Sequence, residues 1–343
     1  MIFGTNKPTK STFSDMSGGK IQNVIIIVKE NHTFDNYFGT FPGVDGAQLP
    51  RAPNPPLRDP DHRHSAWLNR NTVAVRQQYV ESDIPAYFAY ARQFTLCDRY
   101  FTDVAGPSTP NHLMLIAADS PFIDNPKHGD PSRLKTSLPL SLEKKGLTWS
   151  NYGGYAFQYL SGLKGTMQVS SDKFILDAQE GRLPNVSWVY APSEFDEHPP
   201  DPGGKASMGN VTLGMQWTVD QVNAIVESGL WSHSAIFITW DDYGGWWDHV
   251  DPPNVESWQK STPIPSYQGT QFRYGSRVGC LMLGPYARKG YVSKQLHSHV
   301  SLAKFCESIF GLPPLNDRDR SADNMLDCFD FGQNPASPPP SKP

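Results

Sequence analysis

Residues 22–39 read QNVIIIVKENHTFDNYFG, and the rest of the chain is best understood outward from this stretch. It contains five consecutive apolar β-branched residues at positions 24–28, followed at once by polar residues. An apolar run of this length, bounded by polar residues, is typical of a strand buried on both faces of a parallel sheet. Residues just past the carboxyl end of such a strand face the crevice in which α/β proteins bind ligands. We therefore expect Glu30 and Asn31 to hold a metal ion or a polar substrate.

The composition indicates a globular enzyme with long irregular loops. The chain has 343 residues, 31 of them proline, and a net charge of −4 without a basic cluster, which argues against nucleic-acid binding. No segment approaches the run of about 18 apolar residues that a membrane span requires. Length alone allows one or two domains, and we expect a flexible lead at 1–20 and a disordered Pro/Ser-rich tail at 332–343.

The cysteines and the amino terminus carry little functional signal. The four cysteines are widely spaced and form no Cys-x-x-Cys motif, so we interpret them as buried small residues. They are Cys97, Cys280, Cys306 and Cys328. Residues 1–20 lack the apolar core of a signal peptide. We expect either a cytoplasmic protein or one whose export signal is absent from this sequence.

A second strong strand is predicted at residues 235–240, and Asp241 and Asp242 follow it directly. If both strands are parallel and central, their acidic ends converge with Glu30 and Asn31 at one edge of the sheet. Like charges packed together are costly unless a cation lies among them. Oxygen ligands suit Mg²⁺, Ca²⁺ or Mn²⁺, and a histidine ligand would extend the choice to Zn²⁺ or Fe. The alternative is that each acidic pair is a solvated turn or a helix cap.

Ser108 is the candidate nucleophile. Gly106 and Pro107 interrupt the chain before a helical pattern, so Ser108 lies at a predicted helix N-terminus. Free N–H groups and the helix dipole favour phosphate at such a position, and a nearby metal would favour the alkoxide. The simpler interpretation is that Ser108 or Thr109 is only the N-cap.

Histidines near the ends of predicted elements are candidates for a general acid and for phosphate contacts. They are His112, His198, His249 and His299. Each alone is equally consistent with a loop or core histidine. Trp246 and Trp247, in an aromatic loop, either wall a pocket or pack that loop.

Predicted strands alternate with predicted helices, which favours a three-layer α/β/α sandwich with a mostly parallel central sheet. The strands are expected at 24–28, 95–101, 147–152, 186–190, 235–240 and 278–283. The helices are expected at 85–94, 108–118, 212–228 and 299–310, the last capped by Ser298 and stopped by Gly311. Residues 40–72 are interpreted as a long surface loop over the site.

Five ordered stretches resemble a known family. The chain is similar to the bacterial phosphoesterases that include phosphatidylcholine-type phospholipases C and AcpA-like acid phosphatases, within the alkaline phosphatase superfamily. The resemblance covers residues 21–331, nearly the whole chain, and implies that these residues form a single catalytic domain. The matching stretches are VIIIVKENHTFDNYFGTFPGVDG, GPSTPNHL, DEHPP, ITWDDYGGWWDHVDPP and GSRVGCLMLGPYARKGYVSKQLHSHVSLAKFCESIFGL.

The resemblance implies an alkaline-phosphatase-like sandwich with one active site. By motif position it implies that Glu30, Asn31, Asp241 and Asp242 bind one or more divalent metal ions. It implies Ser108 as nucleophile and His198, His249 and His299 near the phosphate and leaving group. Substrate contacts are expected from Asn111, His112, Trp246 and Trp247. Two positions depart from the family pattern: His112 stands where an arginine is often found, and Ser298 stands where an acidic residue is common.

The expected reaction is metal-dependent phosphoester hydrolysis through a phosphoserine. His299 or His198 is expected to protonate the leaving oxygen. The expected substrate is a small phosphoester or a phospholipid head group, acted on as by an acid phosphatase or a phospholipase C. One alternative is a sulfatase, because Ser108-x-Pro110 is similar to a sulfatase signature, although His112 replaces its arginine. Another is a non-catalytic protein whose aromatic loop binds a sugar or lipid.

Overall fold

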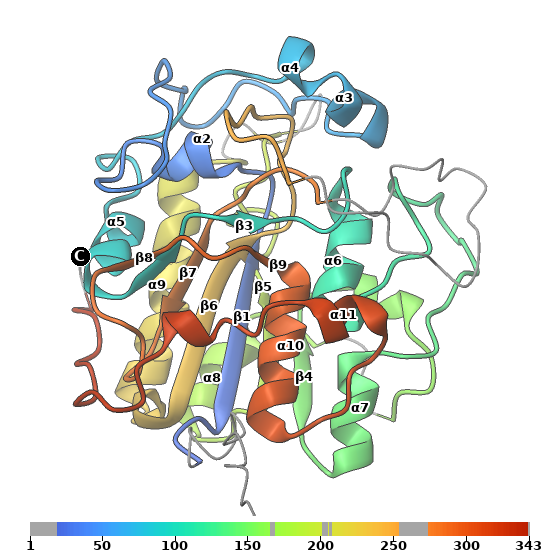
Figure 1. The fold of residues 1–343 in the computed structure, drawn as a ribbon, viewed down its shortest axis with the longest axis vertical. Coiled ribbons are helices and arrows are strands. Elements are labelled where there is room, and N and C mark those ends of the chain that lie inside the picture. The colour runs from blue at the N-terminus through green and yellow to red at the C-terminus, as the bar shows by residue number, and fades with distance from the viewer. Residues whose placement is uncertain (1–18, 165–168, 201–204, 206–207, 254–273, 342–343) are drawn as a thin grey trace, which may run out of the picture.

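A computed structural model describes residues 19–341, apart from 165–168, 201–204, 206–207 and 254–273. Most of the predicted flexible lead, residues 1–18, lies outside the described residues. A seven-stranded sheet forms the centre, in the order β4-β5-β1-β6-β7-β2-β8, and β3 and β9 form a separate pair (Figure 1). The strands are β1 Asn23–Lys29, β2 Thr95–Cys97, β3 Tyr100–Phe101, β4 Trp149–Tyr152, β5 Val186–Tyr190, β6 Ser234–Trp240, β7 Cys280–Leu283, β8 Tyr291–Ser293 and β9 His297–Ser298.

The sheet is mostly parallel, as predicted. Strand β1 pairs in parallel with β5 and β6, β4 with β5, and β2 with β8, whereas β7 runs antiparallel to both β6 and β2. All seven residues of β1 are buried, and so are all seven of β6. Their continuous apolar runs therefore lie at the centre of the sheet, where neither face meets water.

Helices cover both faces of the sheet. On one side α6 contacts α7 and α10, and α10 contacts α11; on the other side α9 contacts α5 and α8 (Figure 1). This confirms the three-layer arrangement. The helices are α2 Phe34–Phe38, α3 His64–Leu68, α4 Arg70–Val73, α5 Pro85–Gln93, α6 Ser108–Ala117, α7 Leu138–Lys145, α8 Lys173–Gln179, α9 Val211–Glu227, α10 His299–Phe310 and α11 Asp317–Ser321, with short 3₁₀ turns η1 Tyr155–Tyr159, η2 Leu230–His233 and η3 Leu326–Cys328.

Local capping signals set the ends of the longest helices. Ser298 begins α10 in a capping box with Ser301, and Gly311 ends it with a φ of 62°, as the sequence predicts. Asn210 begins α9 by accepting hydrogen bonds from the N–H groups of Thr212 and Leu213. These ends were predictable because a cap depends on residues only a few positions apart.

Other boundaries differ from the prediction because contacts between distant segments set them. The strand expected over 95–101 is two short strands, of which β2 joins the main sheet and β3 pairs with β9. The loop expected over 40–72 contains α3 and α4. Neither Ser108 nor Thr109 is the N-cap of α6: Pro107 takes that position, and Ser108 is the first helical residue. The serine side chain is therefore not used to cap its own helix.

The tail also differs from the expectation of disorder, because its described part, 332–341, lies against the body. Ala336 is buried, its N–H donates to the carbonyl of Pro285 at 2.7 Å, and its carbonyl accepts from Trp231 Nε1 at 3.0 Å. A proline-rich segment loses little conformational freedom on ordering, and its carbonyls remain available to donors of the body. The assignment of residues 21–331 to one catalytic domain stays a prediction.

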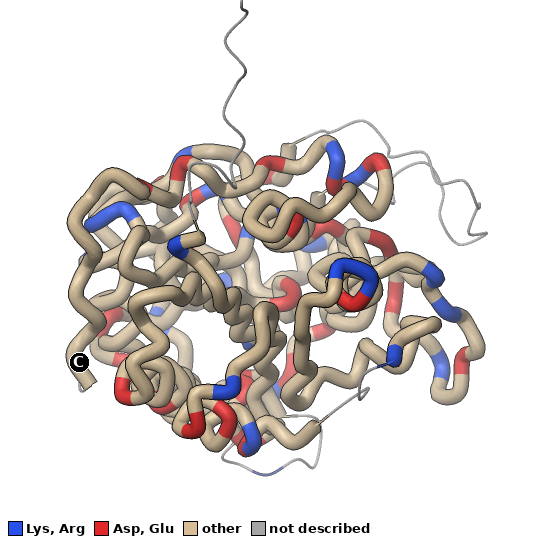
Figure 2. Tube along the Cα trace, turned by 90° about the horizontal axis from the view of Figure 1, so that it is seen from below, with Lys and Arg blue, Asp and Glu red and all other residues tan. Residues whose placement is uncertain are grey.

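Charge is spread over the molecule. Figure 2 shows basic and acidic positions interspersed along the trace, consistent with the small net charge of −4. Across the described ranges, no helix is both long enough and apolar enough to cross a bilayer.

Candidate active site

The acidic ends of β1 and β6 lie side by side. Lys29 pairs with Trp240 in register, and the Asp241 N–H donates to the Lys29 carbonyl at 2.9 Å. The chain then turns sharply at Asn31, which has a φ of 66° and donates its N–H to Asp241 Oδ1 at 2.9 Å. Gly244 closes over this turn, where a Cβ would come within 2.2 Å of the Asn31 carbonyl oxygen. The predicted convergence of the two strand ends is therefore present in the fold.

Ser108 faces these strand ends from the first turn of α6. Its Oγ donates to Asp242 Oδ2 at 3.0 Å and lies 3.4 Å from Glu30 Oε2. The Asn111 side chain holds the preceding loop, since its Oδ1 accepts from the Val104 N–H at 2.9 Å and its Nδ2 contacts the carbonyls of Val104, Gly106 and Pro107. Asn111, expected to contact substrate, thus has its amide committed to the loop that positions Ser108.

His112 lies one turn further along α6, among the carboxylates. Its Nε2 is 3.2 Å from Glu30 Oε1 and 3.3 Å from Asp241 Oδ2. Burial alone would lower the pKa of His112, but the two carboxylates outweigh it and raise the pKa to about 10. Ligand atoms of His112, Glu30 and Asp241 all lie within 4.8 Å of one another. Expected to contact substrate, His112 instead lies with the predicted metal ligands.

The donor set fits a divalent cation. Asn31 is fully buried, yet neither its side-chain oxygen nor its nitrogen has a hydrogen-bond partner among the described residues. Burial and the neighbouring Asp241 raise the pKa of Asp242 well above its usual range, and burial and Glu30 raise that of Asp196 to about 8. Crowded carboxylates beside an unpartnered amide are the arrangement that a hard cation relieves. Glu30, Asn31, Asp241 and Asp242 are therefore suitable ligands, and His112 offers a nitrogen ligand beside Glu30 and Asp241.

A buried network of hydrogen bonds and an ion pair holds the segment that contains His198 at the same edge of the sheet. Fully buried Lys29 donates to the carbonyls of Phe195 and Gly214 and forms an ion pair with Glu197 at 3.4 Å. Glu197 also accepts hydrogen bonds from the hydroxyls of Tyr37 and Tyr87 and from Nε1 of Trp240. The Glu30 N–H donates to the Asp196 carbonyl at 2.9 Å. The DEHPP motif is thus tied to the end of β1.

His198 is held by its Nδ1, which donates to the Pro199 carbonyl at 2.7 Å, so Nε2 is the nitrogen directed away from the backbone. Burial alone would lower the pKa of His198, but Glu30 and Asp59 outweigh it and raise the pKa to about 9. These two carboxylates therefore favour the protonated, positively charged form of the ring. The structure places it beside a second histidine, His62, with 5.9 Å between ring centroids.

His62 was not among the predicted site residues. Its Nδ1 lies 3.5 Å from Asp59 Oδ1, and although burial opposes protonation, Asp242 and Asp59 raise its pKa. The adjoining pocket has a volume of about 350 Å³ and reaches Ser108's neighbour Pro107. It is lined by Asp59, Asp61, His62, Arg63, Pro107, Asp124 and Asn125. The loop had been expected to cover the site, and its Asp-x-x-His spacing was the signal that could have identified His62.

His299 lies beneath the acidic cluster. It is fully buried, with Nε2 2.6 Å from the Asp241 carbonyl oxygen and Nδ1 3.0 Å from the Tyr100 hydroxyl. Burial lowers its pKa to about 4. With both ring nitrogens engaged, His299 is placed to position Asp241, and no contact between it and Ser108 is found among the described residues.

The remaining predicted residues lie in separate clusters. His249 contacts Asp35 and Asp45 through its two ring nitrogens, at 2.6 and 3.0 Å. Trp246 is buried and stacks on His32, with ring centroids 5.7 Å apart. Trp247 donates from Nε1 to Asn71 Oδ1 at 3.2 Å and packs under the guanidinium of Arg76. The structure does not bring these three side chains into the contacts around Ser108.

Replacing His299 by alanine tests its position beneath Asp241. We expect metal affinity and kcat/KM to fall about 10–100-fold, because an outer partner orients a ligand without touching the substrate. The shape of the pH–rate profile should be retained. His233→Ala, at an exposed histidine of η2, is the matched control. Loss of one limb of the pH profile in His299→Ala, with metal affinity unchanged, would instead identify His299 as the general acid.

Comparisons with known proteins identify the family of the chain. The model of the Phosphoesterase family matches residues 21–59 and 58–313 of the chain. The chain belongs to the Phosphoesterase family. Non-hemolytic phospholipase C of Pseudomonas aeruginosa is 25% identical over an alignment 412 positions long, gaps included, which covers 93% of this chain and 58% of that protein. Phospholipase C B of Mycobacterium tuberculosis is 26% identical over an alignment of 431 positions, which covers 94% of this chain and 80% of that protein.

A likeness to solved structures concerns the fold alone. The PsFucS1 sulfatase from Pseudoalteromonas sp. has a TM-score of 0.53 and 12% sequence identity, over 94% of this chain and 75% of that one. At this identity the similarity shows a shared sandwich and says nothing about sulfate esters. The chain spans little more than half the length of the first of its phospholipase relatives.

Proposed function

We propose that this member of the Phosphoesterase family hydrolyses phosphodiesters in the manner of a phospholipase C, with Ser108 as nucleophile. The observation that carries the proposal is the position of Ser108 Oγ, at a helix N-terminus and 3.0 Å from Asp242 Oδ2. The relatives named phospholipase C favour a phosphodiester over a phosphomonoester. A sulfatase and a non-catalytic binder remain the alternatives.

The side chains of this site supply each proton transfer. Asp242 accepts the hydrogen bond of the Ser108 hydroxyl and is the nearest recipient of its proton. Ser108 then attacks phosphorus in line, and the N–H groups at the start of α6 stabilise charge on the phosphoryl oxygens. His198 protonates the departing alcohol oxygen. In a second displacement water attacks the phosphoserine, the now neutral His198 takes the proton of that water, and Ser108 Oγ leaves and regains its proton from Asp242. Two inversions retain the configuration at phosphorus.

A divalent cation held by Glu30, Asn31, Asp241 and Asp242 would stabilise negative charge at phosphorus and favour the ionised Ser108 hydroxyl. The pocket next to Ser108 supports a diester. Three of its lining residues, Asp59, Asp61 and Asp124, are acidic and only Arg63 is permanently basic. Such a lining disfavours the second negative charge of a phosphomonoester and suits a neutral or cationic head group.

Parallel assays decide among the alternatives. We expect kcat/KM for p-nitrophenyl phosphorylcholine and bis(p-nitrophenyl) phosphate to exceed that for p-nitrophenyl phosphate by at least about 10-fold. The monoester would place its second negative charge beside the acidic pocket without a cationic partner. His198→Ala should slow an alkyl diester much more than a p-nitrophenyl diester, because p-nitrophenolate leaves without a proton.

Three outcomes would overturn the proposal. Preference for the monoester would favour an acid phosphatase. Turnover of p-nitrophenyl sulfate would favour a sulfatase if the peptide containing Ser108 were also lighter by two hydrogens, the mass change on conversion of serine to formylglycine. No turnover of any ester by metal-loaded protein would favour a binding protein. A uniform loss in His198→Ala for both leaving groups would remove His198 as the acid, and His62→Ala is the variant to compare.

A further inference from the structure

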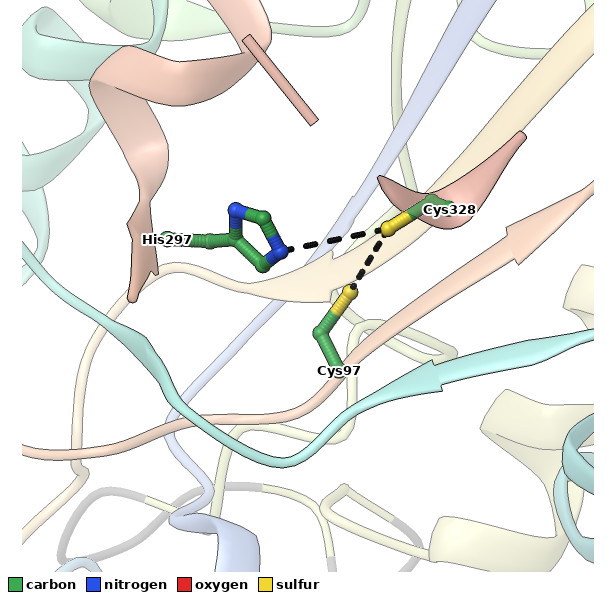
Figure 3. Close-up of side chains that lie close together, drawn as sticks. All are labelled: Cys97, His297 and Cys328. Atoms are coloured by element: carbon green, nitrogen blue, oxygen red, sulfur yellow. Dashed lines mark hydrogen bonds between the residues drawn. The ribbon is translucent and has the colours of Figure 1, made fainter. Parts of the chain in front are cut away.

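A second group of ligand-type side chains lies apart from Ser108, where three distant segments meet. Cys97 ends β2, His297 begins β9, and Cys328 ends η3. Figure 3 shows the two sulfurs and the imidazole turned toward one another. The Sγ atoms of Cys97 and Cys328 are 3.7 Å apart, and Cys328 Sγ is 3.9 Å from His297 Nε2. All three residues are buried.

Asp327 adds a fourth ligand atom. Its Oδ1 lies 3.2 Å from His297 Nε2 and 3.6 Å from Cys328 Sγ. In a tetrahedral zinc site, with metal–sulfur bonds of about 2.3 Å and metal–nitrogen or metal–oxygen bonds of about 2.0–2.2 Å, neighbouring ligand atoms are about 3.3–3.8 Å apart. The observed separations of 3.2 to 3.9 Å are close to these edges. A cation could therefore be held with small side-chain adjustments.

The surroundings orient these side chains as they would around a metal. Asp323 Oδ1 is 2.8 Å from His297 Nδ1, so a carboxylate lies against the far side of the imidazole. Histidine ligands usually have such an outer partner, which directs Nε2 to the metal. Ser293 Oγ donates to Asp327 Oδ2 and lies 3.1 Å from His297 Nε2. Asp323 thus orients the imidazole of His297, and the Ser293 hydroxyl orients Asp327.

We propose that Cys97, His297, Asp327 and Cys328 form a structural site for one zinc-type divalent cation. Two thiolates and an imidazole select zinc over Mg²⁺ or Ca²⁺, and four protein ligands leave no open position for catalysis. Binding releases one proton from each thiol, and His297 binds as the neutral ring with its proton on Nδ1. The proposal is independent of the assignment of Ser108.

The cation would join the C-terminal segment to the sheet. Cys328 is 231 residues from Cys97, so the site closes a very long loop. It also fixes the residues that enter α10, because His297 lies two positions before His299, which contacts the Asp241 carbonyl. A disulfide between Cys97 and Cys328 is the competing arrangement. It requires the sulfurs to approach to about 2.05 Å and involves neither His297 nor Asp327.

The test begins with the full-length protein purified without chelator. We expect elemental analysis to find zinc that remains in Glu30→Gln and is lost in Cys97→Ser and Cys328→Ser. Cys306→Ser, at a buried cysteine of α10, is the matched control and should keep the zinc. Cobalt exchange into the wild-type protein should give a thiolate-to-cobalt charge-transfer band. The oxygen-rich site at Glu30 contains no thiolate and cannot produce that band.

Thiol counting keeps the test decisive if the serine variants do not fold. The denatured wild-type protein should show four reactive thiols once zinc is chelated. Only two reactive thiols, restored to four by a reductant, would overturn the proposal in favour of the disulfide. Absence of zinc with four free thiols, or cobalt binding without a charge-transfer band, would overturn it as well. Failure of phosphodiesterase activity would not affect any of these readouts.

Discussion

Ser108→Ala is expected to lower kcat/KM for the phosphodiester substrate by about 10⁴-fold or more, the scale on which removal of a covalent nucleophile acts. Only Oγ is lost, and that atom contacts Asp242 and Glu30 rather than the core. The carboxylates, Asn31 and the start of α6 remain, so the variant should still bind metal and inorganic phosphate. Steady-state kinetics and phosphate titration measure the two effects separately.

Thr109→Ala is the control for this substitution. Thr109 carries the next hydroxyl on the same helical turn, but its Oγ1 contacts Tyr155 rather than the carboxylates. Its activity should stay within a few-fold of the wild type. Quenching the wild-type reaction in acid should trap a phosphoryl group on the peptide that contains Ser108. Substantial turnover by Ser108→Ala would contradict the nucleophile assignment and leave water as the attacking group.

Asp241→Asn is expected to remove one divalent ion per chain and to lower kcat/KM by about 10²–10³-fold. Asparagine keeps the shape of the side chain and the hydrogen bond from the Asn31 N–H, but it removes the negative charge beside His112. The cluster then attracts a cation less strongly, and a buried imidazole loses one of its two acidic neighbours. Elemental analysis and metal titration measure the loss directly.

Asp220→Asn, at an exposed carboxylate on α9, is the matched control and should retain both metal and activity. Far-ultraviolet circular dichroism should show that Asp241→Asn keeps its helices and sheet. If Asp241→Asn kept the full metal content and activity, the ends of β1 and β6 would not be the metal site. The cation would then have to lie with the other carboxylates near Ser108, of which Asp59 is the first to test.

The sequence alone was sufficient to predict which strand ends and which helix start form this site. The apolar runs before Glu30 and Asp241 are local signals, and parallel neighbouring strands necessarily bring their carboxyl ends to one edge. The start of α6 at Ser108 also follows from nearby residues, although Pro107 rather than a hydroxyl residue caps it. These features depend on short spacings, which a sequence displays directly.

Only the tertiary structure decided which histidines belong to the site. His62 reaches it from the irregular segment before α3, whereas His299 turns both ring nitrogens to Tyr100 and the Asp241 carbonyl. His249 is drawn to Asp35, 214 residues away. The cluster of Cys97 and Cys328 also depends on tertiary packing, because the two cysteines are 231 residues apart along the chain and form no sequence motif. Side-chain partners of this kind depend on how distant segments pack, so they cannot be predicted from the local pattern of residues.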